Sequence, residues 1–225
     1  MSKTEKKLRQ HIIELCREMN RNGLNQGTSG NISARYEDRM LITPTATSYD
    51  SMEPEMIASM PIDDNEALVF EGPIKPSTEW RFHRDILRER TEANAVVHAH
   101  PTFATTLAIG RLGIPACHYM IAAFGGNNVR CSDFAVYGTA ELSEYALAAL
   151  EGRTACLLAN HGSIAIGADL DKAMWRAVEL ETISRQYFYS LQLKDGPVIL
   201  GDEEIAETLK GFGAYGLQKA LKKAG

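Results

Sequence analysis

The sequence predicts an α/β fold: a three-layer α/β/α arrangement around a central mixed, largely antiparallel sheet. Helical and strand patterns are interspersed along the chain without the regular period of a parallel, doubly wound sheet. The 225 residues are long enough to bury a substantial core. Because no internal repeat, low-complexity segment or linker interrupts them, we expect residues 1–225 to form a single domain.

The composition excludes several classes of protein. With 44% hydrophobic and 24% charged residues, the chain is typical of a soluble globular enzyme. A net charge of -5 and the lack of a basic cluster argue against nucleic acid as the main partner. The sequence shows no apolar signal segment and no run long enough to span a membrane, so we expect a cytoplasmic protein without a membrane partner. The four cysteines form no C-x-x-C pair and are expected to be reduced thiols: Cys16, Cys117, Cys131 and Cys156.

The first part of the chain predicts one helix and a hairpin. Residues 4–21 predict an amphipathic helix whose apolar side chains recur at helical spacing: Leu8, Ile12, Leu15 and Met19. Gly23 is placed to end this helix in a left-handed cap. The turn-forming residues 25–31 lead into strands at 32–36 and 40–43, which predicts a glycine-rich loop with a hairpin behind it.

Shorter elements follow the hairpin. Residues 52–60 predict a short helix, because Pro54 suits its first turn. Residues 61–70 predict a strand, a turn and a second strand.

A helix and a strand in the middle of the chain carry the polar residues of most interest. Residues 77–90 predict a helix with Ser77 or Thr78 as its N-cap and Glu79 in its first turn. The remaining predicted elements are a strand at 95–100, a helix at 101–109, a strand at 114–119, a helix at 139–150 capped by Thr139, strands at 154–159 and 164–166, and helices at 169–190 and 202–209.

Two histidines on one strand suggest a metal site. In an extended strand His98 and His100 point to the same face, so their imidazoles can chelate one metal ion. His161 follows a later apolar strand and is the candidate third ligand, and Glu79 is the candidate carboxylate. Spacing alone leaves open that these are isolated core or surface histidines.

The other three histidines are interpreted as structural. His11 lies on a solvated helix, and His83 is expected to pack or to hydrogen-bond on the helix of Glu79. His118 is left without a specific role.

Two segments have the chemistry of an anion site. The loop from Gly27 to Asn31 offers backbone N–H groups and small hydroxyls, but it lacks the lysine of a P-loop and the glycine order of a dinucleotide site. Ser77 and Thr78, at a helix N-terminus, form a second phosphate-friendly element. Each alone is equally typical of an ordinary turn or cap. Because Glu79 is adjacent to Thr78, the two segments together favour a small phosphorylated substrate that bridges phosphate and metal.

Six motifs occur together and in order, and as a set they resemble the class II aldolase/adducin family. They cover almost the whole chain: 27–33, 42–45, 77–83, 97–100, 118–123 and 160–162. The resemblance implies a metal-dependent aldehyde-lyase with one Zn²⁺ per subunit, in which Co²⁺ or Mn²⁺ can also bind. It also implies a homotetramer whose sites lie between subunits.

The resemblance also implies a role for each matching residue. The metal ligands would be His98, His100, His161 and, at rest, Glu79. Glu79 would act as acid and base once substrate displaces it, and Tyr119 would act as proton donor or acceptor in a neighbouring subunit's site. The phosphate pocket would be lined by Thr28, Gly30, Asn31, Thr45, Ala46, Ser77 and Thr78. Tyr137 and Tyr215 would lie near the aldehyde end of the substrate.

The implied reaction is retro-aldol cleavage of a ketose 1-phosphate to dihydroxyacetone phosphate and an aldehyde. A Lewis-acidic metal can stabilise the charge left by C3–C4 cleavage, and a carboxylate can carry the proton. No lysine occurs in these motifs to form a Schiff base. Ala46 and Tyr137 depart from the glycine and phenylalanine of the family's fuculose-phosphate enzymes. The sugar therefore stays open between L-fuculose 1-phosphate and a 5-deoxy- or 5-methylthio-pentulose 1-phosphate.

Two alternatives compete with this interpretation. A pentulose-phosphate 4-epimerase on the same scaffold would carry aspartate at the position of Glu79, so glutamate favours the aldolase. Dehydratases and decarboxylases of the superfamily are less well excluded. A non-catalytic, adducin-like interaction domain would be expected to have lost its ligands, whereas the three histidines and Glu79 are intact.

Overall fold

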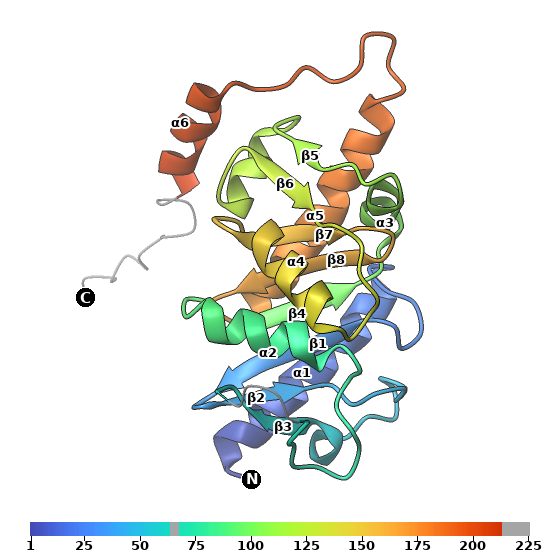
Figure 1. The fold of residues 1–225 in the computed structure, drawn as a ribbon, viewed down its shortest axis with the longest axis vertical. Helices are drawn as coiled ribbons and strands as arrows, with labels where there is room; N and C mark the ends of the chain where they lie inside the picture. The colour runs from blue at the N-terminus through green and yellow to red at the C-terminus, as the bar shows by residue number, and fades with distance from the viewer. Residues whose placement is uncertain (64–67, 213–225) are drawn as a thin grey trace, which may run out of the picture.

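The computed structural model describes residues 1–63 and 68–212, and its centre is an eight-stranded mixed sheet (Figure 1). The strands lie in the order β3-β2-β1-β4-β8-β7-β6-β5. All neighbouring strands pair antiparallel except β6 and β7, which are parallel. The strands are β1 Asn31–Tyr36, β2 Arg39–Ile42, β3 Ala58–Pro61, β4 Ala95–Ala99, β5 Ile114–Pro115, β6 Asn128–Cys131, β7 Ala155–Leu158 and β8 Gly162–Gly167. The predicted mixed, largely antiparallel sheet is confirmed.

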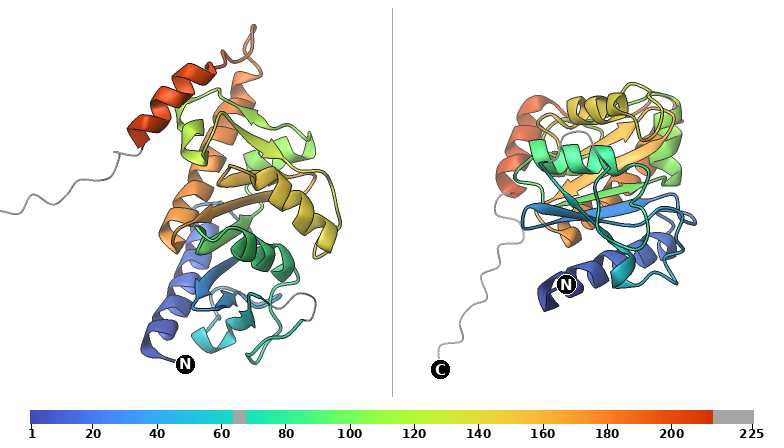
Figure 2. Two further views of the ribbon diagram at one scale, coloured as in Figure 1. Left: turned by 60° about the vertical axis from the view of Figure 1, so that its left-hand side comes forward. Right: turned by 60° about the horizontal axis from the view of Figure 1, so that its bottom comes forward.

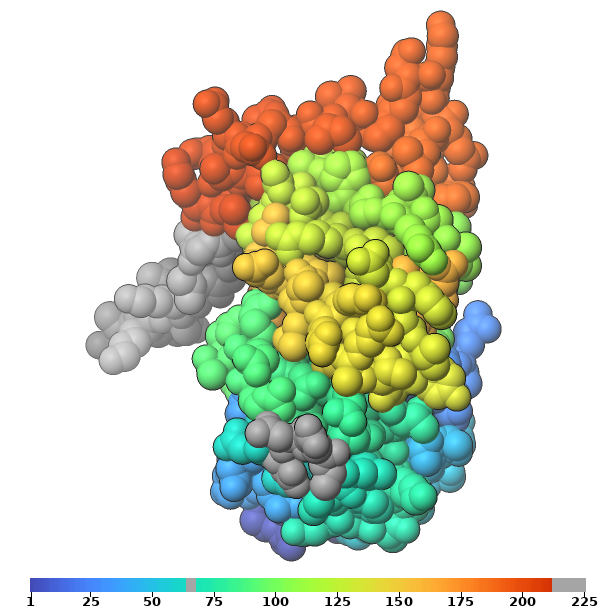
Figure 3. Space-filling model, viewed as in Figure 1, coloured from blue at the N-terminus to red at the C-terminus, as the bar shows by residue number. Residues whose placement is uncertain are grey.

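Helices cover both faces of the sheet, which confirms the three layers (Figure 2). One face is covered by α1 (Lys3–Arg21), α3 (Thr102–Ile109) and α5 (Leu170–Ser190). The other is covered by α2 (Trp80–Glu89) and α4 (Ala140–Leu150), which lie side by side on the face seen in Figure 3. The last described helix, α6 (Asp202–Phe212), packs through Ile205 near the short 3₁₀ helix η2 (Tyr119–Phe124).

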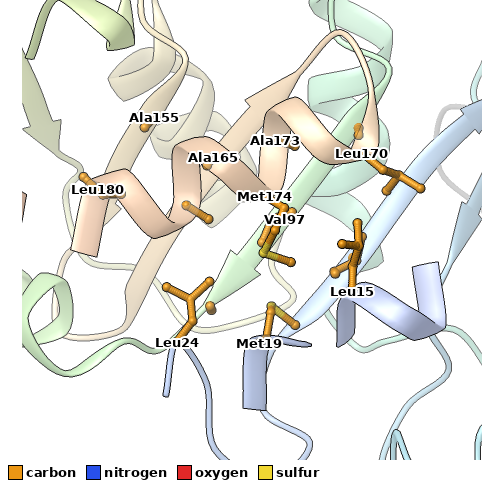
Figure 4. Close-up of a cluster of buried hydrophobic side chains, with 14 of the residues drawn as sticks. Leu15, Met19, Leu24, Val97, Ala155, Ala165, Leu170, Ala173, Met174 and Leu180 are labelled. Atoms are coloured by element: carbon orange, nitrogen blue, oxygen red, sulfur yellow. The ribbon is translucent and has the colours of Figure 1, made fainter. Parts of the chain in front are cut away.

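The alternation of β4 divides the interior into two cores. Val97 joins side chains of α1 and α5 in the first core (Figure 4). Val96 points the other way, into the second core beneath α2 and α4. His98 lies on the same side as Val96, two residues away. Its ring makes an edge contact with Phe82 of α2 at a centroid distance of 5.4 Å. The strand therefore presents its first histidine to the face on which α2 begins.

Three predicted helix ends are confirmed by their hydrogen bonds or dihedral angles. Thr139 Oγ1 accepts from the N–H of Leu142 at 3.2 Å at the start of α4. Asp169 Oδ1 accepts from the N–H of Lys172 at 2.7 Å at the start of α5. Gly23 follows α1 with a φ of 73°, the left-handed conformation expected of a glycine cap.

The helix predicted at 52–60 is wrong. Only Pro54–Met56 makes a 3₁₀ turn, η1, and Ala58–Pro61 is instead the edge strand β3. Pairing with β2 buries Ala58 and Met60 against the second core, so tertiary contacts override the local helical pattern. The strand pair predicted at 61–70 is also wrong. In place of a second strand, a single antiparallel bridge joins Glu71 to Ser59. Residues 64–67 lie outside the described part of the chain.

The predicted start of the helix at 77–90 is wrong by three residues. The helix α2 begins at Trp80, and Glu79 occupies the N-cap position without a side-chain cap bond. Ser77 and Thr78 therefore belong to the turn before the helix rather than to its cap. Ser77 Oγ accepts from the N–H of Glu79 at 3.3 Å, which holds that turn closed.

The strand predicted at 114–119 ends after two residues. The chain turns at Cys117 and continues as η2, where His118 Nδ1 accepts from the N–H of Met120 at 3.2 Å. His118 is thus the cap of this 3₁₀ helix. The strand β6, which the sequence analysis did not predict, follows directly after the turn at Gly125 and pairs with β5 and β7.

Within the described ranges, no helix combines the length and apolar character needed to cross a membrane.

The N-terminus of α3, which directly follows the histidine strand, is held by a carboxylate from α5. Glu181 accepts from the N–H groups of Phe103 and Ala104 at 2.9 and 2.8 Å. We expect Glu181→Ala to lower the free energy of unfolding by about 1–3 kcal/mol, because it leaves two helix N–H groups without an acceptor. Urea denaturation measures the change. Gln186→Ala on the exposed side of the same helix is the control, and an equal loss in both variants would contradict this role.

Candidate metal centre

Three histidines from two parts of the sheet converge on one point. His98 lies on β4, His100 lies just beyond its end, and His161 lies in the turn between β7 and β8. Antiparallel pairing of β4 with β8 sets His98 opposite Ile164, which brings the turn of His161 beside the strand end. The three ring centroids lie 4.8–4.9 Å apart, and one ligand atom from each ring falls within 4.8 Å of the others. The described residues thus contain a three-histidine group that can hold a metal ion.

Glu79 joins this group from the other layer. It stands immediately before α2, which packs on the same face of the sheet as His98, and it is buried with only 5% of its surface exposed. Its Oε2 lies 3.2 Å from His98 Nε2, and its Oε1 lies 3.1 Å from His161 Nε2. The carboxylate is therefore the fourth donor predicted for this centre, in contact distance of two of the three rings.

One ring nitrogen of His98 is held by the backbone, and the other faces the group of donors. His98 Nδ1 lies 2.9 Å from the carbonyl oxygen of Ser163, which can only accept, so Nδ1 carries the proton. The other ring nitrogen, Nε2, lies 3.2 Å from Glu79 Oε2 and 3.0 Å from His100 Nε2. Imidazole nitrogens and a carboxylate oxygen gathered around one point are a donor set that fits a bound metal ion.

Glu79 fits the same interpretation. Its buried Oε1 has no hydrogen-bond donor among the described residues, although His161 Nε2 is only 3.1 Å away. The two atoms are close but form no hydrogen bond, which is the arrangement expected of two ligands of one ion. Burial by itself raises the pKa of Glu79, but His98 and His161 outweigh it and hold the pKa well below its usual range. The carboxylate is ionised.

His100 is also in the form that binds metal. Burial, together with the neighbouring His98 and His161, lowers the pKa of His100 to about 4. Its ring is neutral at physiological pH and can donate a lone pair. Three imidazoles beside a carboxylate are a donor set typical of catalytic metal sites.

A pocket of about 390 Å³ opens beside the histidines and gives the centre access to solvent. Glu79, His100 and His161 lie in its wall, and Tyr137 lies on its rim with 65% of its surface exposed. The remaining lining residues are Thr78, Phe134, Ala135, Val136 and Asn160. The apolar wall of residues 134–136 was not predicted, because no sequence motif marks it.

The segments predicted to bind phosphate are brought together by backbone hydrogen bonds. Thr43 at the end of β2 pairs with Ile32 of β1, and its carbonyl accepts from the N–H of Ser77 at 2.9 Å. The N–H of Thr45 donates to the carbonyl of Lys75 at 3.0 Å. The beginning of β1, the end of β2 and the turn before α2 therefore lie side by side, next to Glu79.

Each of these segments has a backbone suited to an anion. Gly30 leaves no room for a side chain, since a Cβ would lie 2.9 Å from the carbonyl oxygen of His98. The Tyr49 hydroxyl donates to the carbonyl of Gly30 and fixes the loop. Within the described ranges, the N–H groups of Thr28 and Gly30 have no protein acceptor. Ala46 has a φ of 49°, a left-handed conformation that glycine adopts more readily than other residues.

Of the seven residues predicted to bind phosphate, only Thr78 lines this pocket. The other six do not line it: Thr28, Gly30, Asn31, Thr45, Ala46 and Ser77. Tyr119, on η2, is 53% exposed and does not line the pocket. Thr28 is exposed on the loop before β1. Tyr215 lies outside the described residues.

An open pocket that adjoins three convergent imidazoles and a carboxylate on a mixed α/β sheet defines a metal centre of the catalytic type. Residues 10–188 match the family model described as the class II aldolase and adducin N-terminal domain. The chain belongs to this family.

Two relatives and one solved structure are similar to this chain over most of its length. It is 47% identical to the L-fuculose phosphate aldolase of Escherichia coli K12, over 94% of this chain and 97% of that protein. It is equally 47% identical to a 5-methylthioribulose-1-phosphate/5-deoxyribulose-1-phosphate aldolase of Rhodospirillum rubrum, over 93% and 92%. A solved structure of an L-fuculose 1-phosphate aldolase superposes with a TM-score of 0.87 and 35% identity, and the match covers 95% of this chain and 98% of that one.

Proposed function

We propose that this chain is a zinc-dependent aldolase that cleaves a ketose 1-phosphate to dihydroxyacetone phosphate and an aldehyde. The observation that carries the proposal is the position of Glu79, in contact distance of His98 and His161 and next in sequence to the phosphate-friendly Ser77 and Thr78. Its aldolase relatives support retro-aldol chemistry. The enzyme is expected to work in the cytoplasm as a homotetramer.

His98, His100 and His161 would hold one divalent ion per subunit, with Glu79 as the fourth ligand at rest. The ion supplies Lewis acidity to the charge that develops when the C3–C4 bond breaks. Zn²⁺ is the ion that we propose, and Co²⁺ or Mn²⁺ suit the same imidazoles. Once displaced, the Glu79 carboxylate would take up the proton that the C4 hydroxyl loses and deliver it to C3 of the three-carbon fragment.

The remaining roles are proposed from the family motifs. The backbone and hydroxyl groups before β1, after β2 and before α2 hold the phosphate next to the metal centre; they belong to Thr28, Gly30, Asn31, Thr45, Ala46, Ser77 and Thr78. Tyr137, on the pocket rim, faces the aldehyde end. Tyr215 is proposed for the same end from its motif position.

A panel of ketose 1-phosphates tests the function. The zinc-loaded protein is offered the fuculose, rhamnulose, ribulose, 5-deoxyribulose and methylthioribulose 1-phosphates, and release of dihydroxyacetone phosphate is followed by a coupled reduction. We expect release from L-fuculose 1-phosphate or from a 5-deoxy- or 5-methylthio-pentulose 1-phosphate. Formation of an epimer without dihydroxyacetone phosphate would contradict the proposal and favour the 4-epimerase.

Tyr119 is proposed to act in the pocket of a neighbouring subunit, as proton donor or acceptor at the aldehyde end of the substrate. We expect Tyr119→Phe to lower kcat by about 10²–10⁴-fold, because a positioned acid or base contributes about this much. Tyr189→Phe, also at an exposed tyrosine, is the control. Steady-state kinetics measure the change.

Mixed assemblies test whether Tyr119 acts across a subunit boundary. When Tyr119→Phe and His161→Ala chains are co-expressed, some sites combine an intact metal centre with an intact tyrosine. Activity above that of either variant alone is expected. Unchanged kcat in Tyr119→Phe would leave the tyrosine without a catalytic role, and no recovery in the mixture would place it in its own subunit's site.

A further inference from the structure

A chain of four buried polar groups leads away from the metal centre into the second core. Asn31 Nδ2 lies 2.8 Å from Glu79 Oε2, and Asn31 Oδ1 lies 2.5 Å from His83 Nε2. His83 Nδ1 lies 2.7 Å from Ser33 Oγ. Ser33 and His83 are fully buried and Asn31 is 4% exposed, so water does not compete for these hydrogen bonds.

The secondary structure explains why these groups meet. Asn31 and Ser33 are two residues apart on β1 and so point to the same face of the sheet. That face is covered by α2, whose first turn carries His83 four residues after Glu79. The ring of His83 stacks on Phe82 at a centroid distance of 4.7 Å, which fixes its orientation. The helix thus holds both the carboxylate and the histidine against one strand.

The direction of every hydrogen bond follows from the Asn31 amide. Asn31 turns its N–H₂ to Glu79 Oε2 and its oxygen, which can only accept, to His83 Nε2. His83 must then donate from Nε2. Burial, together with the neighbouring His98, lowers the pKa of His83 to about 3, so the ring is neutral and Nδ1 is an acceptor. Ser33 donates to it, and the chain runs from Ser33 through His83 and Asn31 to Glu79.

We propose that His83 is a positioning residue which, in its Nε2–H form, fixes the orientation of the Asn31 amide and through it the position of the Glu79 carboxylate. This proposal depends on the proposed function in one respect: the group that His83 positions is Glu79, the proposed acid and base. A rotated Asn31 would set its own oxygen against Glu79, and the two acceptors would repel. Among the described residues, no other hydrogen bond to the Asn31 side chain would prevent that rotation once the donor at His83 is lost.

Two variants separate positioning from packing. His83→Phe keeps a ring on Phe82 and removes the donor, whereas His83→Gln can place an N–H near the position of Nε2. We expect His83→Phe to lower kcat by about 10- to 100-fold with KM changed by less than about threefold, and to weaken Zn²⁺ binding by about tenfold, as for other residues that orient metal ligands. His83→Gln is expected to recover most of both. His11→Phe, at a half-exposed histidine of α1, is the control.

A readout independent of turnover decides the tautomer. The zinc-loaded protein is labelled with ¹⁵N-histidine, and His83 is assigned by its absence from the His83→Gln spectrum. We expect a protonated Nε2 and an unprotonated Nδ1 at pH 7. A proton on Nδ1, an imidazolium, or wild-type kcat and Zn²⁺ affinity in His83→Phe would each overturn the proposal. If no ketose 1-phosphate is cleaved, the function fails, while the tautomer and the Zn²⁺ affinity still test His83.

Discussion

Replacing Glu79 by glutamine is expected to lower kcat by about 10²–10⁴-fold while the protein keeps its metal. The amide has nearly the shape of the carboxylate, so the buried position between His98 and His161 stays filled. It cannot accept and return a proton, however, and the proton at C3 then has no carrier. Three histidines remain as ligands, so metal content is expected to stay near one ion per chain.

Kinetics and elemental analysis of the same preparation test this expectation. Glu207→Gln, at an exposed glutamate of α6, is the matched control and should leave both quantities unchanged. Wild-type kcat in Glu79→Gln would remove Glu79 from the proton transfer. Loss of the metal would show instead that the carboxylate is needed mainly as a ligand.

Removing one imidazole is the second large effect that we expect. His161→Ala should weaken Zn²⁺ binding by more than about 100-fold, because loss of a ligand costs more than the 10- to 100-fold of an outer-shell change. His161 is the best residue for this test, since it lies in a turn and is partly exposed, whereas His98 is fully buried in the second core. The loss of affinity is therefore not confounded by a large cavity.

Competition with a chromogenic chelator measures the affinity. His11→Ala, outside the group of three, controls for the general effect of losing a histidine and should bind Zn²⁺ as the wild type does. A His161→Ala protein that binds one Zn²⁺ with unchanged affinity would contradict the three-histidine centre. Its urea unfolding midpoint, measured without metal, is expected to stay close to that of the wild type.

The parts of the fold that the sequence predicted best are those in which local pattern and tertiary packing agree. The caps at Thr139 and Asp169 and the alternation that turns His98 into the second core are local features, and all three are present. The errors arise where partners distant in sequence decide the structure. Ala58–Pro61 becomes a strand because β2 offers an edge, and the turn of Ser77 closes on Thr43 before α2 begins.

The candidate site was predictable from motifs to the extent that its chemistry lies in short segments. His98 and His100 are two residues apart, and alternation alone brings them together. Their distance to Glu79 depends on how α2 packs on the sheet, and no spacing in the sequence encodes it. The same is true of His83, for which a hydrogen-bonding role was expected while its partners, Asn31 and Ser33, were not identified. An asparagine and a serine at alternate positions of a buried strand are the signal that points to a polar partner on that face.

Titration of the metal-free protein with Zn²⁺ tests the central claim most directly. After chelation, the protein should release no dihydroxyacetone phosphate from its best ketose 1-phosphate. Activity should then rise in proportion to added Zn²⁺ and saturate at one equivalent per chain, and the His161→Ala protein should show no such rise at these concentrations. Full turnover by metal-free protein, or turnover unrelated to bound Zn²⁺, would contradict the proposal that this three-histidine centre performs the cleavage.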